Sequence, residues 1–217
     1  AYYAHRIEGA LAAEKLELAA PQFILLVDRS RWVQAALLYW MSGDKRFHFI
    51  GATPATTGLP GRFEYYATPL GVFNHSVDNP DFRAEGTRNN LGILGYGEKG
   101  MRVYDFGWVN ALRGWGPPKE SLMRLQLHAT DPALLEPKLG RRASKGCIRI
   151  PASLNIFLDR YGILDADYER ALREGEKPWV LRAGRTPAPW PGRYLIVVES
   201  QRNARPSWSP APPRGSK

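Results

Sequence analysis

The most informative part of the chain is Ala143-Ser144-Lys145-Gly146-Cys147-Ile148-Arg149-Ile150, which follows an alternating run from Leu122 to Leu127 that ends at His128. Cys147 is the only cysteine of the 217 residues. A cysteine attacks as its thiolate, and a neighbouring imidazole can take the thiol proton. These segments therefore predict a strand that delivers a base at its end and a turn that delivers a nucleophile.

Outward from this region, short β-branched or aromatic runs alternate with turn residues. The chain has 18 prolines, 21 glycines and 12% aromatic residues, a composition that favours strands joined by turns over a helical bundle. The predicted strands are 23–27, 32–39, 47–50, 72–73, 122–127, 179–181 and 194–198. We predict a mostly β fold, sandwich-like or barrel-like, with a few short helices.

Two helices are predicted. Helical spacing of apolar residues from Ile7 to Leu18 predicts an N-terminal helical appendage over residues 1–20. A second helix is predicted to begin near Pro151, just after Cys147, and to end before Gly162. The catalytic domain is expected over residues 21–182, followed over 183–217 by a Pro/Arg-rich extension with one late strand. Its last segment, 201–217, is expected to be disordered or loosely draped.

The charge and the apolar pattern limit the classes of protein to which the chain can belong. The net charge is +9. Residues 201–217 contain four basic residues and no acidic residue. This balance suits an anionic partner such as a carboxylate-rich polymer, nucleic acid or lipid, but does not choose among them. No apolar run is long enough to span a membrane. A start at Ala1 fits a removed signal peptide or an expression fragment equally well.

The residues around Cys147 fit acyl transfer. The amides of Gly146 and Cys147 could together stabilise a tetrahedral oxyanion, and His128 with the N-terminus of the following helix could lower the pKa of the thiol. Metal binding is disfavoured, because structural zinc sites use about four Cys or His ligands and this chain has one cysteine and four scattered histidines. A buried, inert cysteine is the alternative interpretation of Cys147 taken alone.

The ordered motifs resemble the YkuD-type L,D-transpeptidases. The chain has His128-Ala129-Thr130 and then Ser144-Lys145-Gly146-Cys147-Ile148-Arg149, with fifteen residues between His128 and Ser144. This is similar to the family's His followed, after about fourteen to seventeen residues, by Ser/Thr-His-Gly-Cys. Val27-Asp28-Arg29-Ser30 resembles its opening hairpin, and Thr68-Pro69-Leu70-Gly71-Val72-Phe73 its Thr-Pro-x-Gly-x-Phe element. The resemblance covers about residues 22–182.

The resemblance implies the role of each site residue. Cys147 would be the nucleophile and His128 the base, with Gly146, Ser144 and Ala129 supporting the oxyanion site. The chain departs from the pattern at Lys145, where the family usually has His, and at Ala129, where it often has Gly. We expect Lys145 to raise the local positive potential and, like Arg149, to bind substrate carboxylates. A structural pin for the loop is the alternative role of Arg149.

The resemblance implies a cofactor-free cysteine acyltransferase of the periplasm or cell envelope, active in cell-wall biogenesis and cell shape, and acylated by carbapenems. It would cleave the L,D-amide of a peptidoglycan tetrapeptide stem, release D-Ala and pass the acyl group to a stem amine in a 3–3 cross-link, to a lipoprotein or outer-membrane protein, or to a D-amino acid. A hydrolase of the same family and a non-catalytic wall-binding module are the alternatives. Nucleic-acid binding is disfavoured, since no reading module is present.

Seven tryptophans include Trp108 and Trp115, upstream of His128. Core packing is the simpler interpretation of both, and a lid or a sugar-stacking surface is the alternative.

Overall fold

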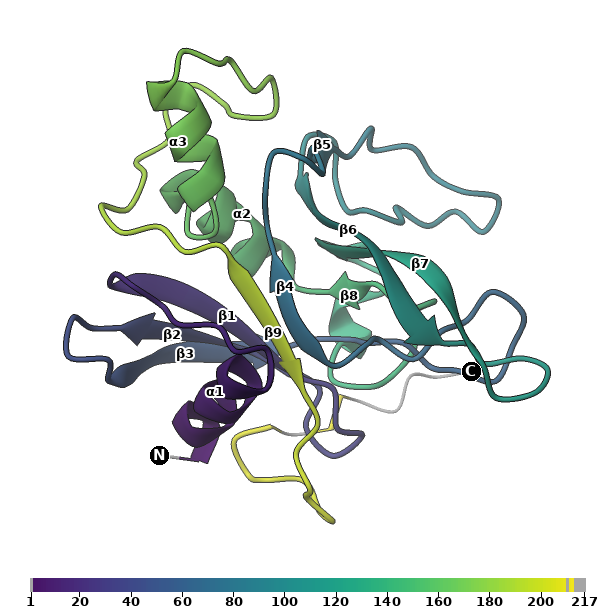
Figure 1. The fold of residues 1–217 in the computed structure, drawn as a ribbon. Helices are drawn as coiled ribbons and strands as arrows, with labels where there is room; N and C mark the ends of the chain where they lie inside the picture. Colours follow the sequence, from purple (N-terminus) through teal and green to yellow (C-terminus); the bar gives the residue numbers. More distant parts are fainter. Residues whose placement is uncertain (1, 210, 213–217) are drawn as a thin grey trace.

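The computed structural model describes residues 2–209, 211 and 212. Its elements are α1 (Tyr2–Ala13), β1 (Gln22–Asp28), β2 (Ala35–Met41), β3 (Phe47–Pro54), β4 (Gly71–Asn74), β5 (Phe82–Arg83), β6 (Arg102–Leu112), β7 (Glu120–His128), the 3₁₀ helix η1 (Glu136–Lys138), β8 (Ile148–Arg149), α2 (Ala152–Tyr161), α3 (Ala166–Arg173) and β9 (Tyr194–Val198) (Figure 1). The predicted mostly β fold with short helices is confirmed.

The strands form two sheets. The first has the order β3-β2-β1-β9-β4 and the second the order β5-β6-β7-β8. The predicted hairpin is confirmed, because β1 and β2 pair antiparallel, with Leu25 opposite Leu38. β9 pairs parallel to β1 and antiparallel to β4, so the chain returns from its far end into the middle of the first sheet.

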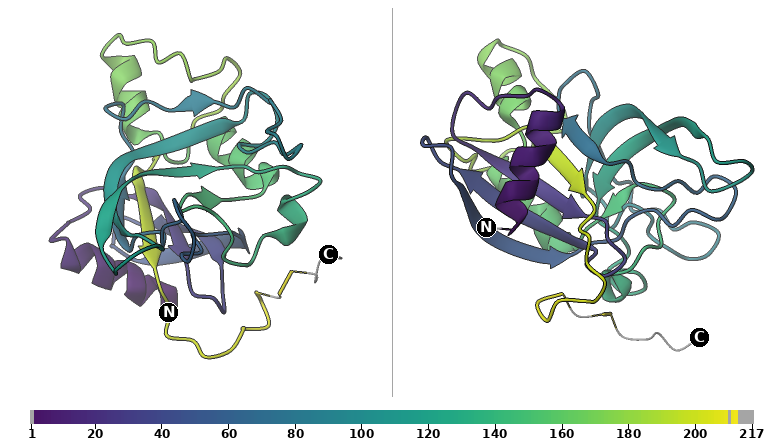
Figure 2. Two further views of the ribbon diagram at one scale, coloured as in Figure 1. Left: turned by 90° about the vertical axis from the view of Figure 1, so that its right-hand side faces the viewer. Right: turned by 60° about the horizontal axis from the view of Figure 1, so that its bottom comes forward.

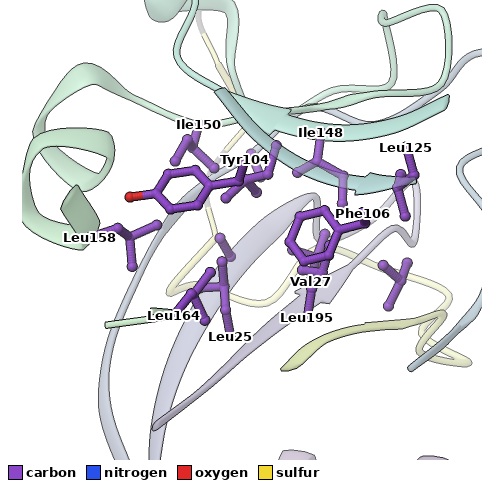
Figure 3. Close-up of a cluster of buried hydrophobic side chains, with 14 of the residues drawn as sticks. Leu25, Val27, Tyr104, Phe106, Leu125, Ile148, Ile150, Leu158, Leu164 and Leu195 are labelled. Carbon is purple, nitrogen blue, oxygen red and sulfur yellow. The ribbon is translucent and has the colours of Figure 1, made fainter. Parts of the chain in front are cut away.

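The main hydrophobic core lies between the two sheets. Leu25 and Leu195 of the first sheet meet Phe106, Leu125 and other side chains of the second in one buried cluster (Figure 3). Leu158 of α2 joins the same cluster. Alternate residues of β1 and β9 point to opposite faces, since a strand has a side-chain period of two. The first sheet therefore also has an outer apolar face.

Helix α1 covers that outer face (Figure 2). Tyr3, Ile7 and Leu11, spaced four residues apart on one side of the helix, are buried against Ile24 and Ile196. The helix begins and ends about five residues earlier than the predicted 7–18, because its buried stripe starts at Tyr3. It is fastened to the sheet by the Tyr3 hydroxyl, which donates to Asp28 Oδ2 at 2.7 Å.

The C-terminal region belongs to the same fold. The predicted late strand is confirmed as β9, whose place inside the first sheet makes residues 183–217 more than an extension. The strand predicted at 179–181 is wrong, since these residues form a turn and a bend. Of the two alternatives for the tail, 201–209 agrees with a draped segment, which has no helix or strand: Ser209 Oγ donates to the Val33 carbonyl, and Arg205 donates to Gly140 O. The rest of that prediction, 210 and 213–217, lies outside the described residues.

A buried ionic cluster joins β6 to the loops before β5 and α3. Arg102, fully buried, donates from Nε to Asp81 at 2.6 Å and from Nη1 to Asp165 at 2.8 Å. His75 lies 2.9 Å from Asp81 through Nε2 and 2.8 Å from Leu164 O through Nδ1. Burial alone would lower the pKa of His75, but the Asp81 charge and hydrogen bond raise it. The cluster therefore links the second sheet to these two loops through ion pairs inside the protein.

Candidate active site

The pairing of β7 with β8 brings the predicted nucleophile and base together. Their parallel register sets Leu127 beside Ile148 and His128 beside Arg149. Leu127 and Ile148 point into the core, so by strand alternation His128, Arg149 and the preceding Cys147 lie on the opposite, outer face. The predicted strand ending at His128 is confirmed as β7.

The imidazole of His128 is held as a neutral base. Its Nδ1 lies 2.6 Å from the Ala129 carbonyl oxygen, which can only accept, so Nδ1 carries the proton and Nε2 keeps its lone pair. Burial lowers the pKa of His128 to about 4, the Ala129 hydrogen bond opposes this, and the Arg149 charge lowers it further. At neutral pH the ring is therefore ready to accept a proton through Nε2.

The thiol of Cys147 is partly buried, and its Sγ lies 3.7 Å from the Arg124 carbonyl oxygen. Burial raises the pKa of this thiol. The expectation that an imidazolium and a helix N-terminus lower it is wrong, because the ring is neutral and the first amide of α2, at Ala152, donates to Glu136 at 2.9 Å. The resting pair is a neutral thiol and a neutral imidazole, which suits transfer of the proton during attack.

Ser144 shapes the turn before Cys147. Its hydroxyl donates to Cys147 O at 2.6 Å and accepts from the Gly146 amide at 3.1 Å. Gly146 has φ +137°, and a Cβ there would lie 2.7 Å from Met123 Cε, so only glycine fits. Because the Gly146 amide is used by Ser144, the Cys147 amide is the better oxyanion donor of the predicted pair.

The Thr-Pro-x-Gly element is the second anchor of this turn. The hydroxyl of Thr68, a buried residue, donates to Gly146 O at 2.6 Å and accepts from the Gly58 amide at 2.8 Å. The Tyr66 amide donates to Lys145 O at 3.0 Å. One segment far upstream in the sequence, from Tyr66 to Thr68, therefore holds the cysteine turn.

Arg149 and Lys145, the two residues predicted to bind carboxylates, differ in the partners they already have. Arg149 lies beside His128 in the register, and its Nε is buried without a hydrogen-bond partner among the described residues. A guanidinium is the kind of group that binds a carboxylate through paired hydrogen bonds. Lys145 is exposed and pairs with Glu64 at 2.9 Å, so its charge is already balanced by a neighbouring carboxylate.

Sequence reasoning missed Tyr96, which extends the site. Its ring meets the His128 ring edge-on at 4.7 Å between centroids, and its hydroxyl donates to Gln126 Oε1 at 3.2 Å. Gln126 in turn donates to Asp105 Oδ2 at 2.9 Å. The one signal in the sequence is an aromatic residue between two glycines, Gly95 and Gly97, in a loop that no motif marks.

The described residues hold neither a metal-binding cluster nor a membrane-spanning helix. Among residues 2–209, 211 and 212, no group of three or more His, Cys, Asp or Glu side chains could hold a metal ion. In the same residues, no helix is both long and apolar enough to cross a bilayer.

Comparisons with known proteins give little further information. No protein-family model matches the sequence, and no curated protein matches it. Among solved structures, the chain is similar to the helical cell shape determining protein Pgp2 of Campylobacter jejuni, with a TM-score of 0.40 and 15% sequence identity. The match covers 86% of this chain and 50% of that one, so the chain spans half the length of Pgp2. At this level of similarity, the function has to be argued from the site itself.

Proposed function

We propose that this protein is a peptidoglycan L,D-transpeptidase with Cys147 as nucleophile and His128 as general base. One observation carries the proposal: β7 and β8 present the thiol and an imidazole that is bonded through Nδ1 to Ala129 O on the same face of a sheet, beside an arginine whose buried Nε has no hydrogen-bond partner among the described residues. The motif resemblance supplies the substrate class, a tetrapeptide stem. The arrangement supplies the chemistry of a cysteine acyltransferase.

In the first step Cys147 Sγ attacks the carbonyl carbon of the third stem residue while its proton passes to His128 Nε2. The Cys147 amide donates to the oxygen that becomes negative in the tetrahedral intermediate. As the intermediate collapses, the C–N bond breaks and His128 returns the proton to the departing amine of D-Ala. Arg149 would hold the carboxylate of this leaving residue. The product is a thioester on Cys147.

In the second step an acceptor amine attacks the thioester, His128 takes its proton, and the thiol is released. His128 is only 5% exposed and the cysteine is partly buried, so bulk water has limited access to the thioester. This favours transfer to a bound amine over hydrolysis. The amine of a neighbouring stem would give a 3–3 cross-link, and a lipoprotein, an outer-membrane protein or a D-amino acid would give the other products.

The substrate places the protein in the cell envelope. Peptidoglycan is a carboxylate-rich polymer, and a net charge of +9 favours association with such a partner at low ionic strength. We therefore propose a periplasmic or wall-facing protein, exported before it acts.

The test is digestion of tetrapeptide-rich peptidoglycan after incubation with the protein, with Cys147→Ala as the control. We expect 3–3 linked dimers that depend on Cys147, identified by mass spectrometry. Tripeptides without dimers would replace the proposal with a hydrolase. No product that depends on Cys147, in the presence of added stem acceptors, would leave a wall-binding module instead.

A further inference from the structure

Trp108 lies on the outer face of β6 with 63% of its surface exposed, although core packing was the simpler expectation. A β-bulge between Asp105 and Trp108 causes this, because it adds a residue at Gly107 and shifts the alternation of the strand. Gly107 has φ +80°, which favours glycine. Without the bulge the indole would point into the core.

The exposed indole shares its face with the thiol. Trp108 pairs with Arg124, and Asp105 pairs with Gln126, whose strand also delivers His128. Strands lie about 4.8 Å apart and residues on one face repeat about every 7 Å, so this register sets Trp108 roughly 12 Å from Cys147. The surface between them belongs to the strands that build the catalytic pair.

Arg124 is fixed on this surface. Its Nε donates to Asp105 Oδ2 at 2.7 Å, and its guanidinium lies 5.9 Å from the Trp108 ring centroid. Asp105 is buried, whereas the Arg124 side chain is 38% exposed. No hydrogen bond from its two terminal nitrogens is present in the described part of the chain. Arg124 thus pairs with Asp105 through Nε and can bind an acidic group of a ligand through its two terminal nitrogens.

The site gives the substrate a direction. Arg149 lies toward the end of β7 at His128, and Arg124 with Trp108 lies on the other side of Cys147. With the leaving carboxylate at Arg149, the part of the donor nearer its N-terminus runs toward Arg124. Three extended residues span roughly 10 Å, which is close to the separation of Trp108 from Cys147. The N-terminus of a stem is joined to the sugar of the glycan strand.

Resting on the proposed function, we propose that the outer face of β6 and β7 binds the glycan end of the donor, with a sugar ring stacked on Trp108 and an acidic group of the stem paired with Arg124. A sugar ring offers a C–H face to a flat indole and hydroxyls at its rim. Exposed Asn110 and Arg124 stand beside the indole as hydrogen-bond donors.

The test compares two donors, a free tetrapeptide and the same tetrapeptide on a disaccharide. We expect kcat/KM for the disaccharide donor to exceed that for the free peptide about tenfold, chiefly through KM. Trp108→Ala should reduce this ratio at least fivefold, and Trp108→Phe should restore part of it. Trp190→Ala is the matched control, since Trp190 is also exposed, at 53%, but lies between Pro189 and Pro191 in a region that does not contribute to the site. An equal ratio in wild type and Trp108→Ala overturns the proposal.

A second arm tests Arg124 with a disaccharide donor whose internal acidic group is amidated. The wild type should prefer the acid over the amide about tenfold, Arg124→Gln should lose this preference, and Arg124→Lys should keep part of it. The same preference in wild type and Arg124→Gln contradicts the assigned pairing.

Binding to Cys147→Ala separates failure of this inference from failure of the proposed function. Turnover of neither donor by the wild type would reject the transpeptidase. Binding of the disaccharide donor by Cys147→Ala, measured by calorimetry and lost in the double variant with Trp108→Ala, would still support the surface. Absence of that binding, or its persistence in the folded double variant, would reject it.

Discussion

At the scale of single residues, the proposed catalytic pair, Cys147 and His128, is neutral at rest. The thiol and imidazole are both desolvated, and desolvation favours the uncharged form of each. The alternative for a cysteine–histidine pair, a preformed thiolate and imidazolium, would show the opposite pKa shifts. This difference can be measured without any substrate.

We predict that alkylation of Cys147 by iodoacetamide rises with a midpoint above the ordinary thiol value of about 8.5, because burial raises the pKa of this thiol. His128→Asn should shift the midpoint little, since the imidazole is uncharged over this range. NMR titration of the His128 ring should give a pKa of about 4. A midpoint below 7 that rises in His128→Asn would instead establish an ion pair.

Thr68 should matter for both stability and rate. Thr68→Val removes the hydroxyl that joins the Gly58 amide to Gly146 O and leaves two buried backbone groups unpaired. We expect a loss of about 1–3 kcal/mol in the free energy of unfolding and a lower kcat. Thr68→Ser keeps the hydroxyl and should remain close to wild type in denaturant titrations and turnover. Equal behaviour of the two variants would show that the hydroxyl does not hold the turn.

At the scale of elements, local patterns predicted the helices, strands and hairpin that form between residues close in sequence. The β1–β2 hairpin, the strand ending at His128 and the helix between Pro151 and Gly162 follow from alternation, turn residues and caps. The place of β9 between β1 and β4 could not be predicted, because that pairing joins residues about 170 positions apart. The strand β6 was missed, because its bulge breaks the alternation that marks a strand.

Helix α1 should contribute strongly to stability as a cover for the first sheet. Ile7 lies on the inner side of this helix and is fully buried. Ile7→Ala should therefore lower the free energy of unfolding by about 2–5 kcal/mol through lost burial and a residual cavity. Glu8→Ala, on the exposed side of the same helix, is the control and should change it by less than about 0.5 kcal/mol. Urea titration measures both. Similar small losses would mean that α1 is a detachable appendage.

At the scale of the whole molecule, the buried charges tie loops and helices to the second sheet. Asp81 accepts from His75, from Arg102 and from the backbone amide of Asp105, a residue of the strand next to the one that ends at His128. The sequence contained these residues but no pattern that joined them, since ion pairs of this kind depend on the completed fold. For the same reason the sequence predicted Cys147, His128 and Ser144 but not Tyr96 or the exposure of Trp108.

Asp81→Asn should be strongly destabilising. It would leave the fully buried Arg102 and His75 without their shared carboxylate, and we expect a loss of about 3–5 kcal/mol in the free energy of unfolding. Asp44→Asn is the matched control, because its pair with Arg46 is largely exposed, and it should cost less than about 1 kcal/mol. Equal small losses in the two variants would show that the cluster adds little to the fold.

The most direct test of the central claim is to trap the acyl-enzyme. The protein is mixed with a tetrapeptide donor without an acceptor amine, quenched in acid and digested, and the mass of the peptide from Gly146 to Arg149 is measured. We predict a thioester adduct of the tripeptide acyl group on Cys147, removed by hydroxylamine, formed much more slowly in His128→Asn and absent in Cys147→Ala. Peptidoglycan cross-linking without any adduct on Cys147, or an adduct formed equally fast in His128→Asn, would contradict the account.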